Sequence, residues 1–155
     1  MQLGLISDTH GLVRPEALTA LAGSSLIIHA GDIGSPDVLD ALGRLAPVYA
    51  VRGNIDRGDW ARHLPTTEVV EIGRRSLYVL HDLGTLDLDP AAADYSVVVS
   101  GHSHRPQARH RGAVLYINPG SAGPRRFSLP IAVARLFVTD DALDYQLVEL
   151  PVAGG

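Results

Sequence analysis

The chain has 155 residues and a formal net charge of -4, and this length fits one domain rather than two. It contains no cysteine, and all 13 basic residues are arginines, which excludes disulfides, iron–sulfur clusters and catalysis by a cysteine or lysine nucleophile. The net negative charge argues against non-specific nucleic-acid binding. The hydrophobic fraction of 46% is enough to form a buried core. We therefore expect residues 1–155 to form a single globular domain.

The beginning of the chain is apolar, but Asp8 and His10 interrupt it and no basic segment opens it, so it does not resemble a signal peptide. No apolar run approaches the roughly 20 residues of a membrane span. We expect a cytoplasmic protein without membrane association.

The first third of the chain alternates between strands and helices. Apolar runs predict strands over residues 3–7, 26–30 and 48–52, and helices over residues 15–22 and 36–45 lie between them. Proline opens both helices, and Ser35 is placed to cap the second. Because the strands are apolar throughout, they are expected to be buried on both faces and mostly parallel.

The remaining chain is richer in strands. We predict a hairpin of residues 68–72 and 77–80, strands over 96–100 and 114–117, and an antiparallel pair of residues 131–138 and 143–150. Together these elements predict two mixed β-sheets flanked by helices, a four-layer α/β/β/α sandwich. The tail, residues 151–155, is expected to be frayed.

Polar side chains follow the predicted strands at their carboxyl ends, where open α/β sheets bind ligands. They are two carboxylates, one amide and four imidazoles: Asp8, His10, Asp32, Asn54, His81, His102 and His104. This nitrogen and oxygen set suits Zn, Fe, Mn, Co or Ni better than Ca, and seven ligands exceed the four of a structural zinc site. A bridging carboxylate would divide the set between two metals about 3.5–4 Å apart, and the cluster would keep a positive charge that favours phosphate.

Taken singly, each of these residues has an ordinary structural explanation. An aspartate after a strand is usually a turn former, and a single histidine is usually a hydrogen-bonded structural residue. The order of the motifs is more specific than any one of them. That order is Asp-Thr-His-Gly at 8–11, Gly-Asp at 31–32, Gly-Asn-Ile-Asp at 53–56, a strand-end histidine at 81, Gly-His-Ser-His at 101–104 and Asn-Pro-Gly-Ser at 118–121.

This series resembles the calcineurin-like metallophosphoesterases, above all their small single-domain bacterial and archaeal phosphodiesterase branch. The resemblance implies a β-sandwich flanked by helices. It implies one metal held by Asp8, His10, Asp32 and His104, and a second held by Asp32, Asn54, His81 and His102, with Asp32 bridging. A metal-bridging hydroxide would attack phosphorus in line, so no side-chain nucleophile is needed.

The expected protein is thus a binuclear phosphoesterase for phosphodiesters, with phosphomonoesters as a further substrate class. Its cofactors would be two divalent ions (Mn, Fe, Zn, Ni or Co), with Mn favoured, and its partner a small phosphoester rather than a nucleic acid. Because the family often forms dimers or tetramers, a homo-oligomer is an open expectation.

Several positions depart from the family pattern or flank it. Ile55 stands where the protein-phosphatase branch has a histidine that protonates the leaving group, so no general acid is assigned. Asp82 and Leu83 follow His81 where many small relatives have glycine or histidine, which leaves substrate preference open. Asp56 could donate a proton directly, but we favour a hydrogen bond between Asp56 and a ligand histidine.

Arginines are the remaining candidates for binding phosphate oxygens. Arg105 and Arg125 are placed near the expected cleft, Arg125 together with Arg126, whereas Arg109 and Arg111 are interpreted as solvated loop charges. His29 is expected to be buried structure.

Two other functions remain open. A non-catalytic scaffold of the same fold would be expected to lose metal ligands, which this chain retains. A nuclease would use the same chemistry, but aromatic residues are only 5% of the chain and no basic stripe is present.

Overall fold

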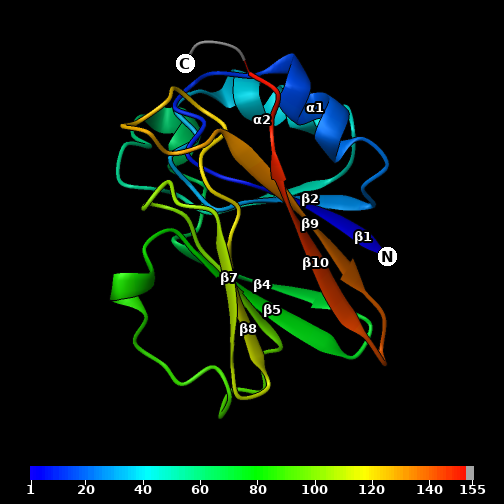
Figure 1. Ribbon diagram of the computed structural model, residues 1–155. Helices are drawn as coiled ribbons and strands as arrows, with labels where there is room; N and C mark the ends of the chain where they lie inside the picture. The colour runs from blue at the N-terminus through cyan, green and yellow to red at the C-terminus, as the bar shows by residue number, and fades with distance from the viewer. Residues whose placement is uncertain (153–155) are drawn as a thin grey trace.

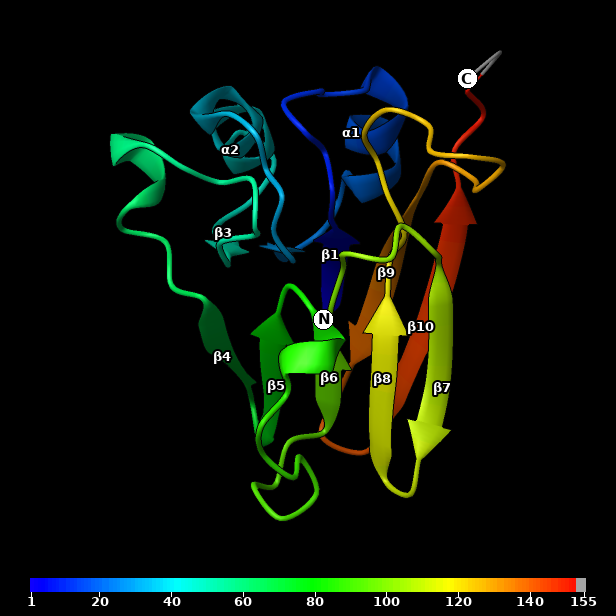
Figure 2. The ribbon, with the colours of Figure 1, turned by 90° about the vertical axis from the view of Figure 1, so that its left-hand side faces the viewer.

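Two five-stranded β-sheets pack face to face in the computed structural model, which describes residues 1–152 (Figures 1 and 2). The first sheet has the order β10-β9-β1-β2-β3, with bounds Leu143–Glu149, Ala132–Val138, Gln2–Ile6, Leu26–His29 and Val48–Ala50. The second has the order β4-β5-β6-β8-β7, with bounds Thr67–Ile72, Arg75–Leu80, Val97–Val99, Val114–Asn118 and Gln107–Arg111. Residues 153–155 of the tail expected to be frayed lie outside the described residues.

Both sheets are mixed, as predicted. In the first, β1, β2 and β3 are parallel, and β9 and β10 are antiparallel to their neighbours. In the second, β5, β6 and β8 are parallel, and β4 and β7 add antiparallel edges. The predicted hairpin is β4–β5, and the predicted C-terminal pair is β9–β10.

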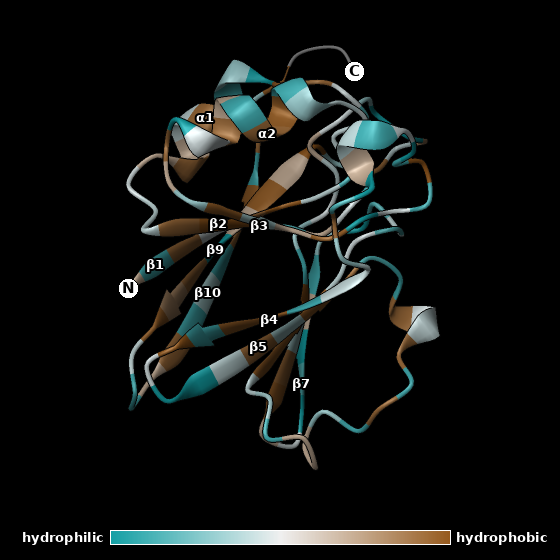
Figure 3. Ribbon diagram, turned by 180° about the vertical axis from the view of Figure 1, so that it is seen from behind, coloured by the Kyte–Doolittle hydropathy of each residue, from teal (hydrophilic) through white to brown (hydrophobic). Residues whose placement is uncertain are grey.

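Helices α1 (Pro15–Leu21) and α2 (Pro36–Gly43) cover the outer face of the first sheet (Figure 1). Ser35 caps α2 as expected, because its hydroxyl accepts a hydrogen bond from the Asp37 amide. Both helices are partly brown and partly teal in Figure 3, the pattern of amphipathic helices. Their buried residues, Leu21, Val38 and Leu42 among them, pack on the sheet.

Alternation along the strands separates two cores. Leu3, Leu5 and Ile28 point between the sheets and meet the apolar side chains of β5, β6 and β8. Ile27, the neighbour of Ile28, points instead to the helices. The sandwich therefore buries both faces of the first sheet, which explains why its strands are apolar without alternation.

The outer face of the second sheet is covered by a loop that carries one short 3-10 helix, η2 (Leu83–Thr85), where Figure 2 shows it in front of β5 and β6. Leu83 and Leu86 pack there on the buried Tyr78 and Leu80. A second short 3-10 helix, η1 (Asp59–Ala61), precedes β4. The fourth layer of the sandwich is thus mostly irregular chain.

The edge strand β7 is the one strand that we did not predict. Its sequence, Gln-Ala-Arg-His-Arg, is polar and largely exposed, because only one side of the strand is paired, with β8. It lacks the apolar pattern on which strand prediction depends.

The carboxyl ends of the strands meet at one edge of the sandwich. The Asp8 amide after β1 donates to the Gly31 carbonyl after β2 at 3.0 Å. His81, after β5, bonds through Nδ1 to the Ala30 carbonyl at 2.7 Å, and its own carbonyl accepts from the Gly101 amide at 2.9 Å. These hydrogen bonds join the site-bearing loops of the two sheets.

Candidate metal centre

Five of the seven expected metal ligands have a left-handed backbone. The φ angles of Asp8, His10, Asp32, His102 and His104 lie between 48° and 72°. Residues other than glycine seldom adopt this conformation, and among residues 1–152 only Asp94 and Phe127 share it. Such strain is concentrated at functional sites, because the surrounding structure must hold it in place.

Two carboxylates and three imidazoles form one cluster. Asp8 Oδ1 lies 3.4 Å from His104 Nε2 and 3.9 Å from His81 Nε2. Asp32 Oδ2 lies 3.3 Å from His81 Nε2 and 3.6 Å from His10 Nε2. The cluster contains two groups whose ligand atoms lie within 4.8 Å of one another: Asp8 with His10 and His104, and Asp8 with Asp32 and His81.

Several atoms of this cluster are buried without a hydrogen-bond partner. They are Asp8 Oδ1, His10 Nε2, His81 Nε2 and His104 Nδ1. Buried polar atoms without partners cost free energy, and a cation bound between them would remove that cost. His81 is prepared as a ligand, because its Nδ1 faces the Ala30 carbonyl and leaves Nε2 to face the carboxylates. The donor set therefore fits divalent metal ions.

Burial and mutual charge shift the pKa values of the cluster in different directions. Burial raises the pKa of Asp8, against the lowering effects of Ser7 and two histidines, and lowers that of His104. Burial also opposes ionisation of Asp32 and His81, but their close approach, backbone hydrogen bonds from Ile55 and to Ala30, and their opposite charges outweigh it. The pKa of Asp32 is therefore lowered and that of His81 raised, as in an ion pair.

The two remaining expected ligands lie at the rim of the cluster. The His102 amide donates to Asp8 Oδ2 at 3.0 Å, and the exposed His102 ring stands edge-on to His81 with centroids 5.2 Å apart. Asn54 is exposed between Gly53 and Ile55, and the Ile55 amide donates to Asp32 Oδ1 at 3.1 Å. Both residues thus occupy loops that contact the buried carboxylates directly.

Two glycines allow these loops to approach one another. A Cβ atom at Gly53 would clash with the backbone nitrogen and Oδ1 of Asp32. A Cβ atom at Gly101 would clash with Ser7 Oγ and lie 2.8 Å from Asp8 Oδ2. The absence of a side chain is a requirement at both positions.

Within residues 1–152, Asp56 forms no hydrogen bond to a ligand histidine, contrary to our expectation. Its Oδ2 accepts hydrogen bonds from the Ile33 and Gly53 amides at 3.1 and 2.8 Å, and its Oδ1 accepts one from Gly34 at 2.9 Å. A single carboxylate satisfies three backbone donors, which is more favourable than one imidazole contact. Asp56 thereby ties the Asp32 loop to the Asn54 loop.

His29 is buried, as expected, and it supports the site through Thr9. No sequence pattern indicated that Thr9 links His29 to the metal-site loop. The Gly31 amide donates to His29 Nδ1 at 3.1 Å, so Nε2 carries the proton and donates to Thr9 Oγ1 at 3.0 Å. Thr9 Oγ1 in turn donates to the Ile33 carbonyl at 2.8 Å. Burial lowers the pKa of His29 to about 3, and the neutral ring holds the loop between Asp8 and His10.

The loop at 118–121 packs against the site. Asn118 Nδ2 donates to the Gly101 carbonyl and to Ser103 Oγ, at 2.9 and 3.1 Å. Ser121 Oγ donates to the Asp8 carbonyl at 3.0 Å.

Of the candidate phosphate-binding arginines, Arg125 lies beside the cluster. It lines a recess of about 250 Å³ with His10, His104, Pro124 and Arg126. The Arg126 charge also contributes to the lowered pKa of His104. Arg105 is exposed and does not line this recess; its amide donates to Ser103 Oγ.

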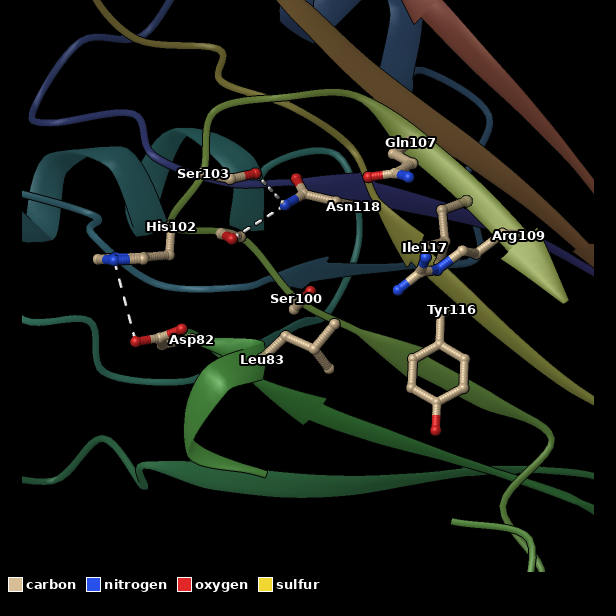
Figure 4. Close-up of a pocket in the computed structure, with 11 residues that line it drawn as sticks. Asp82, Leu83, Ser100, His102, Ser103, Gln107, Arg109, Tyr116, Ile117 and Asn118 are labelled. Atoms are coloured by element: carbon tan, nitrogen blue, oxygen red, sulfur yellow. Dashed lines mark hydrogen bonds and ion pairs between the residues drawn. The ribbon is translucent and has the colours of Figure 1, made fainter. Parts of the chain in front are cut away.

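Arg109 and Arg111 are not loop charges, contrary to our interpretation. Both belong to β7, where Arg111 lies over the Tyr116 ring at 5.0 Å and Arg109 lines a cavity that extends from His102 (Figure 4). The same cavity is lined by Asp82 and Leu83, the two departures from the family pattern after His81.

Comparisons with known proteins identify the family. The model of the calcineurin-like phosphoesterase superfamily domain matches residues 1–141. A probable metallophosphoesterase of Methanothermobacter thermautotrophicus is 35% identical over 163 residues, with 96% of this chain and 92% of the relative covered. Phosphodiesterase YfcE of Escherichia coli K12 is 31% identical over 146 residues, with 78% and 79% covered. The chain therefore belongs to the calcineurin-like phosphoesterase superfamily.

Solved structures show the same fold. An archaeal phosphodiesterase superposes with a TM-score of 0.81 at 24% identity, over 97% of this chain and all (100%) of that one. Vps29 of Chaetomium thermophilum superposes with a TM-score of 0.78 at 18% identity, again over 97% and 100%. Among residues 1–152, no helix has the length and apolar character to cross a bilayer.

Proposed function

We propose that this protein is a two-metal phosphoesterase that hydrolyses small phosphodiesters, with phosphomonoesters as a second substrate class. The observation that carries the proposal is the buried cluster of unpartnered carboxylate and imidazole atoms at the meeting edge of the sheets. The family and the relatives named phosphodiesterase support the choice of reaction.

One metal would be held by Asp8, His10, Asp32 and His104, and the other by Asp32, Asn54, His81 and His102. The position of Asp32 Oδ2, between His10 Nε2 at 3.6 Å and His81 Nε2 at 3.3 Å, supports a bridging role for this carboxylate. Two divalent ions bound there would lower the pKa of water toward neutrality and offset the charge of the phosphate.

The surrounding residues would orient the ester. Arg125 and Arg126 place guanidinium groups in the recess beside His10 and His104, where they can bind non-bridging phosphate oxygens. The side chain at position 55 is an exposed isoleucine and has no proton to donate. We therefore expect esters whose leaving group is stable as an anion to react fastest.

A chromogenic diester tests this function. Protein loaded with Mn²⁺ should release p-nitrophenolate from bis(p-nitrophenyl) phosphate, and Asp32→Asn should lose more than the roughly 10- to 100-fold that outer partners of a metal site cost. Arg44→Gln, an exposed change at the end of α2, should retain the full rate. The proposal fails if protein saturated in turn with Mn, Fe, Zn and Ni is inert toward both diesters and monoesters.

The scaffold hypothesis differs from this one in a property that can be measured without a substrate. A scaffold without metal would leave the Asp8 and His81 atoms of the cluster unpartnered in the working protein, at a free-energy cost that nothing offsets. Saturation binding of fewer than one metal per chain would favour the scaffold.

A further inference from the structure

Besides the recess lined by Arg125, the protein has a cavity that begins at His102, in the loop after β6. This cavity has no role in the function proposed above. It encloses about 210 Å³, and its walls include Asp82, Leu83, Arg109, Tyr116 and Ile117 (Figure 4). His102 is shared between this cavity and the expected metal site. The cavity therefore begins beside one of the expected metal ligands.

The two ends of the cavity differ in charge. His102 and Asp82 stand at one end, with Nε2 and Oδ2 3.9 Å apart, and Arg109 stands at the opposite end (Figure 4). Leu83 lies between these ends, whereas Tyr116, the cross-strand partner of Arg109, stands at the Arg109 end; Figure 4 shows Leu83 pointing toward Tyr116. The cavity thus has a negative group near the expected phosphate, a middle lined by Leu83 together with the polar Ser100 and Asn118, and a positive far end beside the apolar Tyr116 and Ile117.

The guanidinium of Arg109 is available to a ligand. Within the described part of the chain, it makes no hydrogen bond or ion pair, whereas Arg111 on the same strand lies over the Tyr116 ring. Arg135, another strand arginine, donates to the Ala20 carbonyl and to Gln146. A guanidinium presents paired donors that match the two oxygens of a carboxylate.

The size of the cavity limits what it can hold. Pockets for drug-sized ligands usually enclose about 300–1,000 Å³, so a cavity of about 210 Å³ suits a group of roughly one ring. Beyond the phosphate held at the expected metal site, the Asp82 carboxylate disfavours a second anion near His102, and Arg109 favours one at the other end.

We propose that this cavity binds the organic arm of the substrate and that Arg109 selects an arm with a ring-sized apolar body ending in a carboxylate. The proposal rests on the proposed function, because that function places the phosphate beside His102. The substrate class is then a phosphodiester of a carboxylated aryl or similarly compact alcohol. Leu83 contacts the apolar body, and Arg109 binds the terminal carboxylate.

Binding of two phosphinates tests the proposal independently of catalysis, since phosphinates have no ester bond to hydrolyse. The probes are 4-carboxybenzyl(methyl)phosphinate and benzyl(methyl)phosphinate, measured by isothermal titration calorimetry on Mn-loaded protein. The wild type should bind the carboxylated probe about 10-fold more tightly, the size expected for one charge-assisted hydrogen-bonded pair. Arg109→Gln should remove this preference and leave the affinity for the benzyl probe unchanged.

Two further variants complete the test. Arg44→Gln removes the same charge at an exposed position on the far helix layer and should preserve the preference. Leu83→Ala should weaken both probes equally, because it removes apolar contact and leaves Arg109 in place. Three results would overturn the proposal. They are equal binding of the two probes to the wild type, a preference for the carboxylated probe that persists in Arg109→Gln, and no binding of either probe. Failure of diester hydrolysis with the preference intact would instead count against the proposed function alone.

Discussion

Replacing His29 by glutamine removes a buried titratable group and leaves a side chain that can still hydrogen-bond. His29 is 0% exposed, and its ring bonds to the Gly31 amide and to Thr9 Oγ1. Burial lowers its pKa from 6.5 to about 3, with the nearby His81 and His10 acting in the same direction and Asp32 opposing them. Between these two values the unfolded chain binds a proton that the folded chain does not, so stability falls as the pH drops below 6.5.

The size of this effect follows from the two pKa values. At pH 7 the unfolded histidine is mostly neutral and the penalty is about 0.2 kcal/mol, whereas at pH 5 it is about 2 kcal/mol. The glutamine amide cannot reach both the Gly31 amide and Thr9 with the geometry of the imidazole ring, so His29→Gln should be less stable than the wild type at pH 7 by about 1–3 kcal/mol. That difference should shrink by about 2 kcal/mol at pH 5, because the variant has no such group to protonate.

Urea denaturation in the presence of a chelator measures these free energies of unfolding without metal binding. His63→Gln is the matched control: His63 is exposed, so this variant should follow the wild type at both pH values. Parallel pH dependence of the wild type and His29→Gln would refute the assignment of a neutral, buried His29.

Three other substitutions test the architecture of the site and its support. Gly53→Ala should reduce the metal affinity measured by calorimetry, because the added Cβ atom would clash with Asp32. Gly43→Ala is the control and should not change the affinity, because a Cβ atom there faces open space at the end of α2. Equal affinities of the two variants would contradict the close approach of Gly53 to Asp32. Asp56→Asn should lower the free energy of unfolding by about 1–3 kcal/mol, because an amide NH₂ group replaces one carboxylate oxygen and faces backbone amides that are also donors. An unchanged urea midpoint would argue against the hydrogen bonds between Asp56 and these amides. Ser35→Ala should cost about 1 kcal/mol in the same assay through loss of the α2 cap, and no loss would show that the cap is not formed in solution.

The fold was predictable where burial controls the sequence. The strands on either side of the central core, such as Leu26–His29 and Val97–Val99, are apolar because both faces are covered, and proline and Ser35 mark the beginning of α2. Strand β7 was not predicted, because the residues of an exposed edge strand do not need to be apolar. The loop layer with η2 could not be distinguished from a helical one, because Leu83 and Leu86 show only that some segment covers the second sheet.

The metal-ligand set could be proposed from motif order, but its supports could not. The left-handed residues Asp8 and His10 donate tertiary hydrogen bonds to the Gly31 and Asp32 carbonyls, which no local pattern records. Asp56 was assigned to a histidine because a carboxylate near imidazoles commonly has that role, and only the fold brings three amides to it. Arg109 was misassigned for the same reason as β7, since a polar strand resembles a loop in sequence.

We propose that the cluster around Asp8 and Asp32 holds two metal ions. Elemental analysis of protein saturated with Mn²⁺ and then desalted measures their number directly. We predict two ions per chain, whereas fewer than one per chain would contradict the proposed metal centre.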